Sequence, residues 1–296
     1  MKRAYHGGDM GVSSQPRRGA APLPRGQFHL RFSAEPLGRG GLGSVYAVLV
    51  TASNEPSMLV GSNWAAKKLN DSWRNHPEMM TRFEREILAI RSMSHPNIVT
   101  CHGENLPGGE RFYIMPLFSS SVRKCIAEGG LRGNWRQIAK LGAELADALQ
   151  YAHERGFIHR DLKPDNILFN PGAPLVIADW GLGYFVHRHS LVLQQLTRGG
   201  MGTEYYCSLE QWGTGKCDCR GDIYSLGMTL DEWVTGRQRA IEIGMGVNGP
   251  ATLDPADGAV WFNEILRAMT QMRKTDRPVS MTAVAVALRR AAGFRL

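Results

Sequence analysis

The pattern of apolar residues along the 296-residue chain changes near Pro116. In residues 28–69, short runs rich in β-branched and aromatic residues, such as 44–50, alternate with turn-forming residues, which is typical of strands. Residues 98–102 and 111–115 are two further short strand candidates. The part of the chain before Pro116 is therefore predicted to be rich in strands.

Helices are predicted in five segments. Residues 77–93 carry apolar side chains at helical spacing and add one helix to the strand-rich part. The strongest repeat covers 134–155, and three more helices are predicted at 223–235, 260–271 and 281–291. Strands first and helices afterwards predict an α+β fold.

The composition fits a globular protein. Apolar residues make up 43% of the chain, and no run approaches the roughly 18 consecutive apolar residues of a membrane helix. Residues 1–26 are mostly Gly, Pro, Arg and Ser and lack the hydrophobic core of a signal peptide. We therefore expect a disordered basic tail and a cytoplasmic protein without a membrane span.

The net charge of +8 does not alter the expectation of a globular protein. A basic chain can bind nucleic acid, but no basic-aromatic module or zinc-finger spacing occurs, so we expect no nucleic-acid partner. The five scattered cysteines do not form a disulfide framework. Cys217 and Cys219 lack a second ligand pair at zinc spacing, so free thiols are expected.

A glycine-rich loop is the first candidate for chemistry. Residues 37–45 fit the pattern Gly-x-Gly-x-x-Gly-x-Val, with Gly38, Gly40 and Gly43 at the glycine positions. Glycines let the backbone approach phosphates so that N–H groups face them. A dinucleotide-binding loop would continue into a helix, whereas strand-like sequence follows here, so that alternative is disfavoured.

A lysine on a predicted strand is the second candidate. Lys67 needs a partner, because a buried lysine is costly unless it is paired. Glu86, on the helix predicted for 77–93, is the preferred partner, and Glu84 is the alternative. The non-functional interpretation is an edge-strand lysine, which Lys68 fits better.

The most specific segment is 157–168, where charged residues stand between two apolar dipeptides. Asp161 is suited to orient or deprotonate an attacking hydroxyl, and Lys163 to neutralise charge on a transferred phosphoryl group. Asn166 and Asp179 offer the hard oxygen ligands that Mg²⁺ prefers, and Asp179 directly follows an apolar strand candidate.

Together these residues resemble the eukaryotic-type (Hanks-type) Ser/Thr protein kinase catalytic domain, in the order of that family's motifs. The resemblance implies a two-lobed kinase domain over 27–296, with an N-lobe at about 27–115, a hinge at 116–118 and a C-lobe at about 119–296. Its eight matching pieces are the glycine loop, Lys67, Glu86, the 159–166 loop, Asp-Trp-Gly at 179–181, Gly202-Thr203, Glu210 and Arg277.

The resemblance also implies a role for each matched residue and the use of ATP and Mg²⁺. Asp161 would be the catalytic base, Lys67 with Glu86 would mark the active arrangement, and Asn166 and Asp179 would bind the metal. The residues implied to contact ATP are Leu37, Gly38, Gly40, Gly43, Val45, Ala65, Lys67, Met115, Pro116, Phe118 and Leu168.

The implied activation segment carries further assignments. Lys163 and Thr203 match members that phosphorylate serine and threonine, while Glu210 and Arg277 would pair and fix the segment. Arg160 precedes the base and implies a phosphorylated partner, for which Thr197 is preferred over Ser190. We therefore hypothesise that autophosphorylation at Thr197 orders the segment.

Two positions depart from the family pattern, and one further aspartate matches it. Trp180 replaces the usual Phe, and Ser208 stands in an altered Ala-Pro-Glu motif that keeps Glu210. Neither change removes a catalytic group. Asp222 resembles the aspartate that braces the catalytic loop.

Two alternatives to a protein kinase follow from the same residues. A pseudokinase scaffold would bind a partner without catalysis, but Lys67, Asp161, Asn166 and Asp179 are all present. A small-molecule phosphotransferase would share the lobes and the catalytic aspartate, but such enzymes usually lack the Glu210 and Arg277 pieces. The protein substrate and the oligomeric state are not specified by the sequence.

Overall fold

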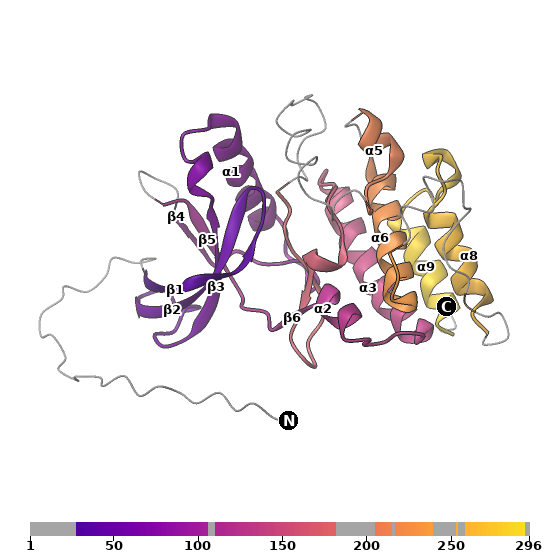
Figure 1. Cartoon of the computed structure of the whole chain (residues 1–296), viewed down its shortest axis with the longest axis horizontal. Coiled ribbons are helices and arrows are strands. Elements are labelled where there is room, and N and C mark those ends of the chain that lie inside the picture. Colours follow the sequence, from indigo (N-terminus) through magenta and orange to yellow (C-terminus); the bar gives the residue numbers. More distant parts are fainter. Residues whose placement is uncertain are drawn as a thin grey trace, which may run out of the picture.

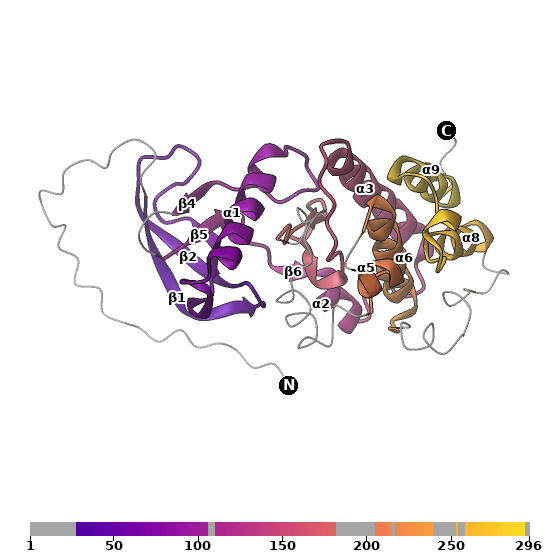
Figure 2. The same cartoon turned by 90° about the horizontal axis from the view of Figure 1, so that it is seen from above.

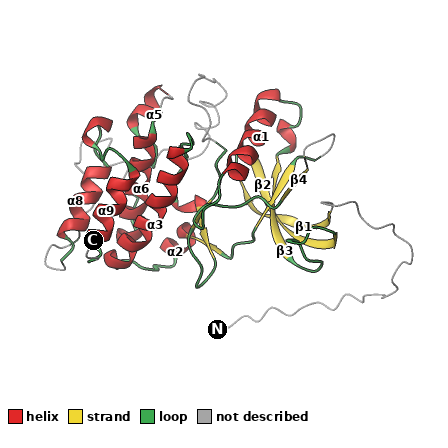
Figure 3. Ribbon diagram, turned by 180° about the vertical axis from the view of Figure 1, so that it is seen from behind, coloured by secondary structure: helices red, strands yellow, loops and turns green. Residues whose placement is uncertain are grey.

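The computed structural model describes residues 28–105, 110–181, 205–214, 217–238, 253 and 258–293. The described chain forms two parts, a β-sheet with one long helix and a larger helical part (Figure 1). Figure 3 shows the strands gathered on one side and most helices on the other. The α+β fold with two lobes is therefore confirmed. The predicted basic tail at 1–26 and the residues Ser190, Thr197 and Thr203 lie outside the described residues.

The sheet of the N-terminal part is antiparallel throughout. Its spatial order is β1 (Phe28–Arg39), β2 (Gly43–Ser53), β3 (Asn63–Leu69), β5 (Phe112–Met115) and β4 (Gly103–Asn105). The register sets Val45 on β2 opposite Lys67 on β3, and Ala65 on β3 opposite Met115 on β5. Residues of the glycine loop, the lysine strand and the end of β5 are thereby neighbours in space.

Helix α1 (Pro77–Ser92) packs against this sheet and matches the prediction for 77–93. Proline occupies its first turn, where the missing N–H has no intrahelical acceptor to lose. Phe83, Ile87 and Ile90 are at most 1% exposed and face the core. Burial of this face fixes the rotation of the helix and directs Glu86 toward β3.

The strand predicted at 98–102 is wrong. Ile98 and Val99 are buried, but the segment forms only an isolated bridge with β8 (Val176–Ile177), through hydrogen bonds from Val99 N to Ile177 O and from Ile177 N to Asn97 O. The adjoining strand β4 begins only at Gly103. A short apolar run indicates burial but does not distinguish a strand from an extended connection.

Six helices with described bounds belong to the C-terminal part (Figure 2). They are α2 (Val122–Ala127), α3 (Trp135–Glu154), α5 (Leu209–Thr214), α6 (Cys219–Thr235), α8 (Val260–Met269) and α9 (Met281–Ala291). Helices α3, α8 and α9 follow the predicted segments closely. Helix α6 starts four residues earlier than predicted, because the Asp218 side chain accepts from Arg220 N and caps it.

Helix α6 forms the centre of this part. Every residue from Gly221 to Val234 is buried, including the polar side chains of Asp222, Ser225 and Thr229. Gly142 of α3 lies against α6, where an added Cβ would be 2.8 Å from Leu230. Such close packing makes α6 a rigid support for the loops that approach it.

A small sheet separates the two parts and carries the loop at 157–166. It consists of β6 (Ser120–Ser121), β7 (Ile167–Phe169) and β8, with the short 3₁₀ helix η2 (Pro164–Asn166) directly before β7. Asp161 and Asp179 therefore stand beside two neighbouring strands. In the described part of the chain, none of the helices has both the length and the hydropathy needed to cross a bilayer.

Candidate active site

Lys67 on β3 contacts two carboxylates. Its Nζ lies 2.7 Å and 2.9 Å from the two carboxylate oxygens of Glu86 and 2.8 Å from Asp179 Oδ1. Glu86 also accepts a hydrogen bond of 2.8 Å from the Tyr113 hydroxyl on β5. The alternative partner Glu84 pairs instead with Arg111, and Lys68 pairs with Glu110. The structure therefore pairs Lys67 with Glu86 and not with Glu84.

The charge of Lys67 and the charges of its two carboxylate partners shift one another's pKa values. Burial opposes the charged form of Lys67, but Asp179 and Glu86 together raise the pKa of its ammonium group. Burial also opposes ionisation of Asp179, yet the Lys67 charge lowers the pKa of that carboxyl to about 2. Burial raises the pKa of Glu86, and Lys67 only partly offsets it. Asp179 is consequently the more firmly ionised of the two carboxyls.

The loop before η2 gathers Asp161, Lys163 and Asn166. Lys163 Nζ donates to Asp161 Oδ2 at 2.8 Å, and Asn166 Nδ2 donates to the Asp161 carbonyl at 2.8 Å and to Oδ2 at 3.2 Å. Both side chains of the Lys163–Asp161 pair are largely buried. Asp161 is thus held by two side chains through Oδ2, and its other carboxylate oxygen receives no hydrogen bond from the residues that the structure describes.

The surroundings of Asp161 favour a stronger base than an ordinary aspartate. Burial raises the pKa of its carboxyl, the positive charge of Lys163 works in the opposite direction, and the negative charge of Asp179 raises it again. A carboxylate of higher pKa accepts a proton more readily, provided that it is ionised at the working pH.

Asp222 on helix α6 accepts hydrogen bonds from the backbone of this loop, and its side chain is fully buried. Its Oδ2 accepts from His159 N and its Oδ1 from Arg160 N, both at 2.8 Å. His153 Nε2 lies 2.7 Å from the same Oδ2. Arg160 has a φ of 66°, which is uncommon for a residue other than glycine. The Asp222 hydrogen bonds hold the backbone in this conformation beside Asp161.

The turn at 179–181 is fixed in a similar way. Asp179 also has a left-handed φ of 63°, and Trp180 is 1% exposed, with its indole N–H donating to Ile177 O at 3.2 Å. The Trp180 ring meets the ring of His159 edge-on, 4.7 Å between centroids. A Cβ at Gly181 would be 2.9 Å from Glu86 Oε2, so a side chain at this position would displace the Glu86 carboxylate that pairs with Lys67. Trp180 therefore replaces the usual Phe as a buried anchor.

Asn166 and Asp179 have the chemistry expected of magnesium ligands. The amide nitrogen of Asn166 is engaged by Asp161, which leaves its amide oxygen as the atom available to a cation. Asp179 contributes a carboxylate that is 44% exposed at the side chain. An amide oxygen and an ionised carboxylate suit a hard divalent ion. The residues present therefore fit Mg²⁺.

Apolar residues predicted to surround adenine lie at the junction of the two parts. Val45, Phe118 and Leu168 are partly buried and pack against the core, and Ala65 and Met115 are buried neighbours across β3 and β5. Pro116 directly follows β5, while Leu37 on β1 is 59% exposed. Of this set, Ala65 and Met115 are direct neighbours and Val45, Phe118 and Leu168 pack against the same core, whereas the side chain of Leu37 is exposed.

The three glycines of the loop differ in how closely other atoms approach them. A Cβ at Gly43 would be 2.6 Å from the Lys68 carbonyl oxygen, so only glycine fits there. At Gly40 the nearest atom would be 3.2 Å away, and at Gly38 no atom lies within 4 Å. Close backbone packing therefore accounts for Gly43, and the open space at Gly38 leaves room for a ligand.

Glu210 and Arg277 form the predicted ion pair. Arg277 donates from its two terminal nitrogens to the two Glu210 oxygens at 2.7 Å and 3.0 Å, and its side chain is fully buried. Its guanidinium also donates to three backbone carbonyls and lies over the Tyr224 ring. This pair fastens α5 to the segment before α9.

Several functional neighbours were not found from the sequence. Tyr113 lies in an otherwise apolar strand, where only its hydroxyl hints at a polar contact. His153 carries no motif signal. Arg123 on α2 contacts Asp165, Glu232 and Tyr206 at 3.2 Å, 2.6 Å and 2.5 Å, and links the catalytic loop to α6.

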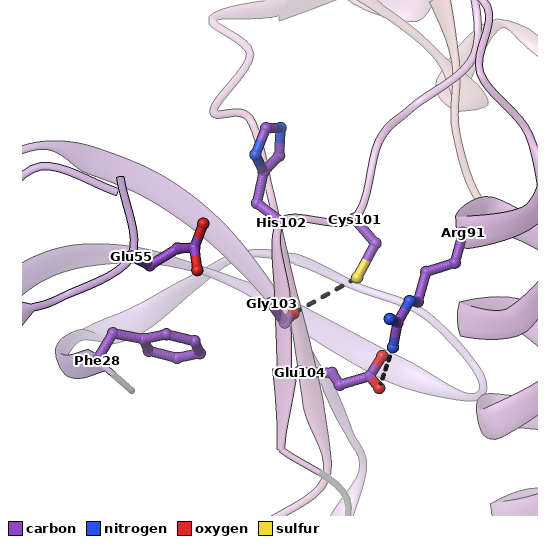
Figure 4. Close-up of a pocket in the computed structure, with 7 residues that line it drawn as sticks. All are labelled: Phe28, Glu55, Arg91, Cys101, His102, Gly103 and Glu104. Carbon is purple, nitrogen blue, oxygen red and sulfur yellow. Dashed lines mark hydrogen bonds and ion pairs between the residues drawn. The ribbon is translucent and has the colours of Figure 1, made fainter. Parts of the chain in front are cut away.

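A separate pocket of about 250 Å³ lies beside β4, the edge strand of the sheet, and none of its lining residues belongs to the predicted site (Figure 4). The Arg91 guanidinium at the end of α1 donates to Glu104, and the Cys101 thiol donates to the Gly103 carbonyl. Burial raises the pKa of the Cys101 thiol to about 11. This thiol is therefore protonated and unreactive near neutral pH.

Comparison with known proteins shows which family this chain resembles in sequence. The sequence pattern of the protein kinase domain matches residues 33–243. The chain is 31% identical over 273 residues to the serine/threonine-protein kinase Pkn1 of Myxococcus xanthus, covering 85% of this chain and 37% of that protein. It is 30% identical over 210 residues to a probable serine/threonine-protein kinase PknB of Bifidobacterium longum, covering 68% and 29%. The chain thus spans about a third of the length of the curated relatives it matches.

Proposed function

The chain belongs to the protein kinase domain family, and on this premise we propose that it transfers the γ-phosphoryl group of ATP to serine and threonine hydroxyls of proteins. One observation carries the proposal: Lys67, Asp161 and Asp179 come from three separate segments, Lys67 Nζ lies 2.8 Å from Asp179 Oδ1, and the charge of Asp179 raises the pKa of Asp161. A structural ion pair would not require a base, a phosphate-binding cation and metal ligands at a single junction.

Asp161 is proposed to act on the attacking hydroxyl. Its carboxylate, held by Lys163 and Asn166, accepts the hydroxyl proton as the new oxygen–phosphorus bond forms. The bond from the γ-phosphorus to the β–γ bridging oxygen breaks, and ADP leaves. The Lys163 ammonium offsets the negative charge on the transferred group.

Lys67 is proposed to hold the α- and β-phosphates, with Glu86 fixing its position. Asn166 and Asp179 would hold Mg²⁺, which when bound neutralises charge on the β- and γ-phosphates. The apolar residues at the junction of the two parts would hold adenine between them, and the Gly38, Gly40 and Gly43 backbone would cover the phosphates.

The pseudokinase alternative predicts the loss of at least one of these groups, and the described residues retain all of them. A small-molecule substrate is disfavoured by the Glu210–Arg277 pair, which anchors the segment that would support a protein substrate. Cytoplasmic location, the absence of a nucleic-acid partner and the phosphorylation of Thr197 stay predictions from the sequence.

The proposal is tested by incubating the purified chain with γ-labelled ATP, Mg²⁺ and a generic basic protein. We expect label on serine and threonine in the substrate and in the chain itself, and none when the divalent ion is chelated. Label on tyrosine alone would contradict the Ser/Thr assignment. ATP binding without any transfer would instead support the scaffold interpretation.

A further inference from the structure

The glycine loop is held from outside by the turn that follows β3. This turn contains Asn70 and the 3₁₀ helix η1 (Asp71–Trp73). Asn70 Nδ2 donates to Gly40 O at 2.9 Å and to Gly41 O at 3.3 Å, and the Trp73 indole N–H donates to Gly41 O at 2.7 Å. The Asn70 backbone N–H donates to Leu42 O at 3.1 Å. Three successive loop carbonyls therefore face one turn.

The orientation of the Asn70 amide is fixed by a neighbour. The Ser44 hydroxyl donates to Asn70 Oδ1 at 2.8 Å, and Ser44 is itself buried. Because the amide oxygen accepts this hydrogen bond, the amide nitrogen is the atom that faces the loop carbonyls. An aspartate at this position would set a carboxylate oxygen against two carbonyl oxygens.

The geometry of the peptide unit gives these contacts a consequence. In a planar trans peptide the C=O and the next N–H point in opposite directions. Carbonyls of Gly40 and Gly41 that face the turn therefore direct the N–H groups of Gly41 and Leu42 to the opposite side. Within the described residues, neither N–H donates to a backbone or side-chain acceptor.

The end of the loop also lies close to Lys67. Lys68 O and Lys67 Cγ would be 2.6 Å and 3.5 Å from a Cβ built on Gly43, so the backbone at the end of the loop passes near the stem of Lys67. Two successive N–H groups without an acceptor among the described residues, just before Gly43, would form an anion-binding concavity.

The turn at 70–74 is itself held in place by ion pairs and a ring contact. Arg74, which follows η1, pairs with Asp71 at 2.8 Å and with Glu110 at 3.1 Å, and Glu110 also pairs with Lys68 on β3. The Trp73 ring meets the His76 ring edge-on, 5.6 Å between centroids, directly before α1. The turn therefore ties the loop to the sheet and to the start of the helix that carries Glu86.

We propose that Asn70 and Trp73 are positioning residues, which hold the glycine loop in the conformation that directs its backbone N–H groups at the phosphates of ATP. This inference rests on the proposed function of the site in binding ATP. Neither residue is required to touch the nucleotide, and their effect passes through the peptide units of Gly40 and Gly41.

The test compares ligands with and without phosphates. Dissociation constants for ADP with Mg²⁺ and for adenosine are measured by calorimetry for the wild type, Asn70→Asp, Asn70→Ala and Trp73→Phe. Ser72→Ala is the matched control, because Ser72 is exposed in the same turn. Loss of hydrogen bonds to the loop should weaken ADP binding about tenfold in Asn70→Asp and several-fold in the other two, with adenosine binding unchanged.

Three outcomes separate this inference from the proposed function. A wild type that binds neither ligand overturns both. Unchanged ADP binding in Asn70→Asp and Trp73→Phe overturns the positioning role alone, as does an equal loss for ADP and adenosine. Thermal melting checks that each variant folds. Limited trypsin cleavage after the exposed Arg39 gives a second readout, which we expect to be faster in Asn70→Asp than in Ser72→Ala.

Discussion

Lys67 Nζ and Asp179 Oδ1 lie 2.8 Å apart, although 112 positions separate the two residues in the sequence. Lys67 belongs to the sheet of the N-terminal part, whereas Asp179 follows β8 between the two parts. One ammonium group thus joins the helix α1, through Glu86, to the loop that carries the proposed metal ligand.

Replacing Lys67 by methionine should abolish transfer and lower stability. The change leaves the Glu86 carboxylate buried without its cation, and breaking one side of a buried ion pair costs about 3–5 kcal/mol. The double variant Lys67→Met/Glu86→Gln should recover at least half of the unfolding free energy while staying inactive. Urea denaturation measures both values, and an equal cost in the single and double variants would show that Glu86 is not the source of the loss.

Removing the Lys163 charge should shift the pH dependence of transfer. The lysine lowers the pKa of Asp161, so Lys163→Ala should raise that pKa further. Because the base must be ionised, activity disappears as the pH falls through the Asp161 pKa, and the acid limb of kcat/KM should move to higher pH. Lys163→Arg keeps the charge and should leave the limb in place. A limb that does not move in Lys163→Ala would argue against Asp161 as the titrating group.

The Glu210–Arg277 pair should be essential to the fold of the C-terminal part. Arg277→Lys cannot reproduce the two-pronged contact, and we expect a loss of at least about 2 kcal/mol in unfolding free energy. The exposed pair Lys274–Asp218 is the control, and Lys274→Ala should change stability by less than about 1 kcal/mol. Chemical denaturation that ranks the two variants equally would refute this difference.

Trp180→Phe should lower stability more than activity. The smaller ring leaves space against His159 and loses the hydrogen bond to Ile177 O, for a cost of about 1–3 kcal/mol. The Ile177 carbonyl keeps its bond from Val99 N, so no acceptor is left unpaired. Phosphoryl transfer at a temperature well below unfolding should stay within about threefold of the wild type, and a much larger loss would show that the indole sets the geometry of Asp179.

Site residues could be predicted from the sequence where they lie close together along the chain and fold into a single turn. Asp161, Lys163 and Asn166 lie within six residues of one another, so one turn brings them together. The preference for Glu86 over Glu84 rests on the position of Glu86 nine residues before His95. The structure explains why only Glu86 pairs with Lys67, since two residues that far apart on a helix cannot both face the sheet.

Other features depend on contacts that no local pattern encodes. The segment 98–102 is as apolar as a strand but pairs with β8 through a single bridge. Tyr113, His153 and Arg123 act through partners 27, 69 and 109 positions away. The hydrogen bonds from Asn70 and Trp73 to the glycine loop likewise arise only once β2 and β3 have paired.

Phosphoryl transfer by Asp161→Asn, compared with the wild type at saturating ATP and Mg²⁺, tests the central claim most directly. The amide is nearly the same size and keeps the contacts around it, but it cannot accept the proton of the attacking hydroxyl. We expect ATP binding to be retained and the rate of serine and threonine phosphorylation to fall by about 10²–10⁴-fold. Equal rates in the two proteins would contradict the assignment of Asp161 as the catalytic base.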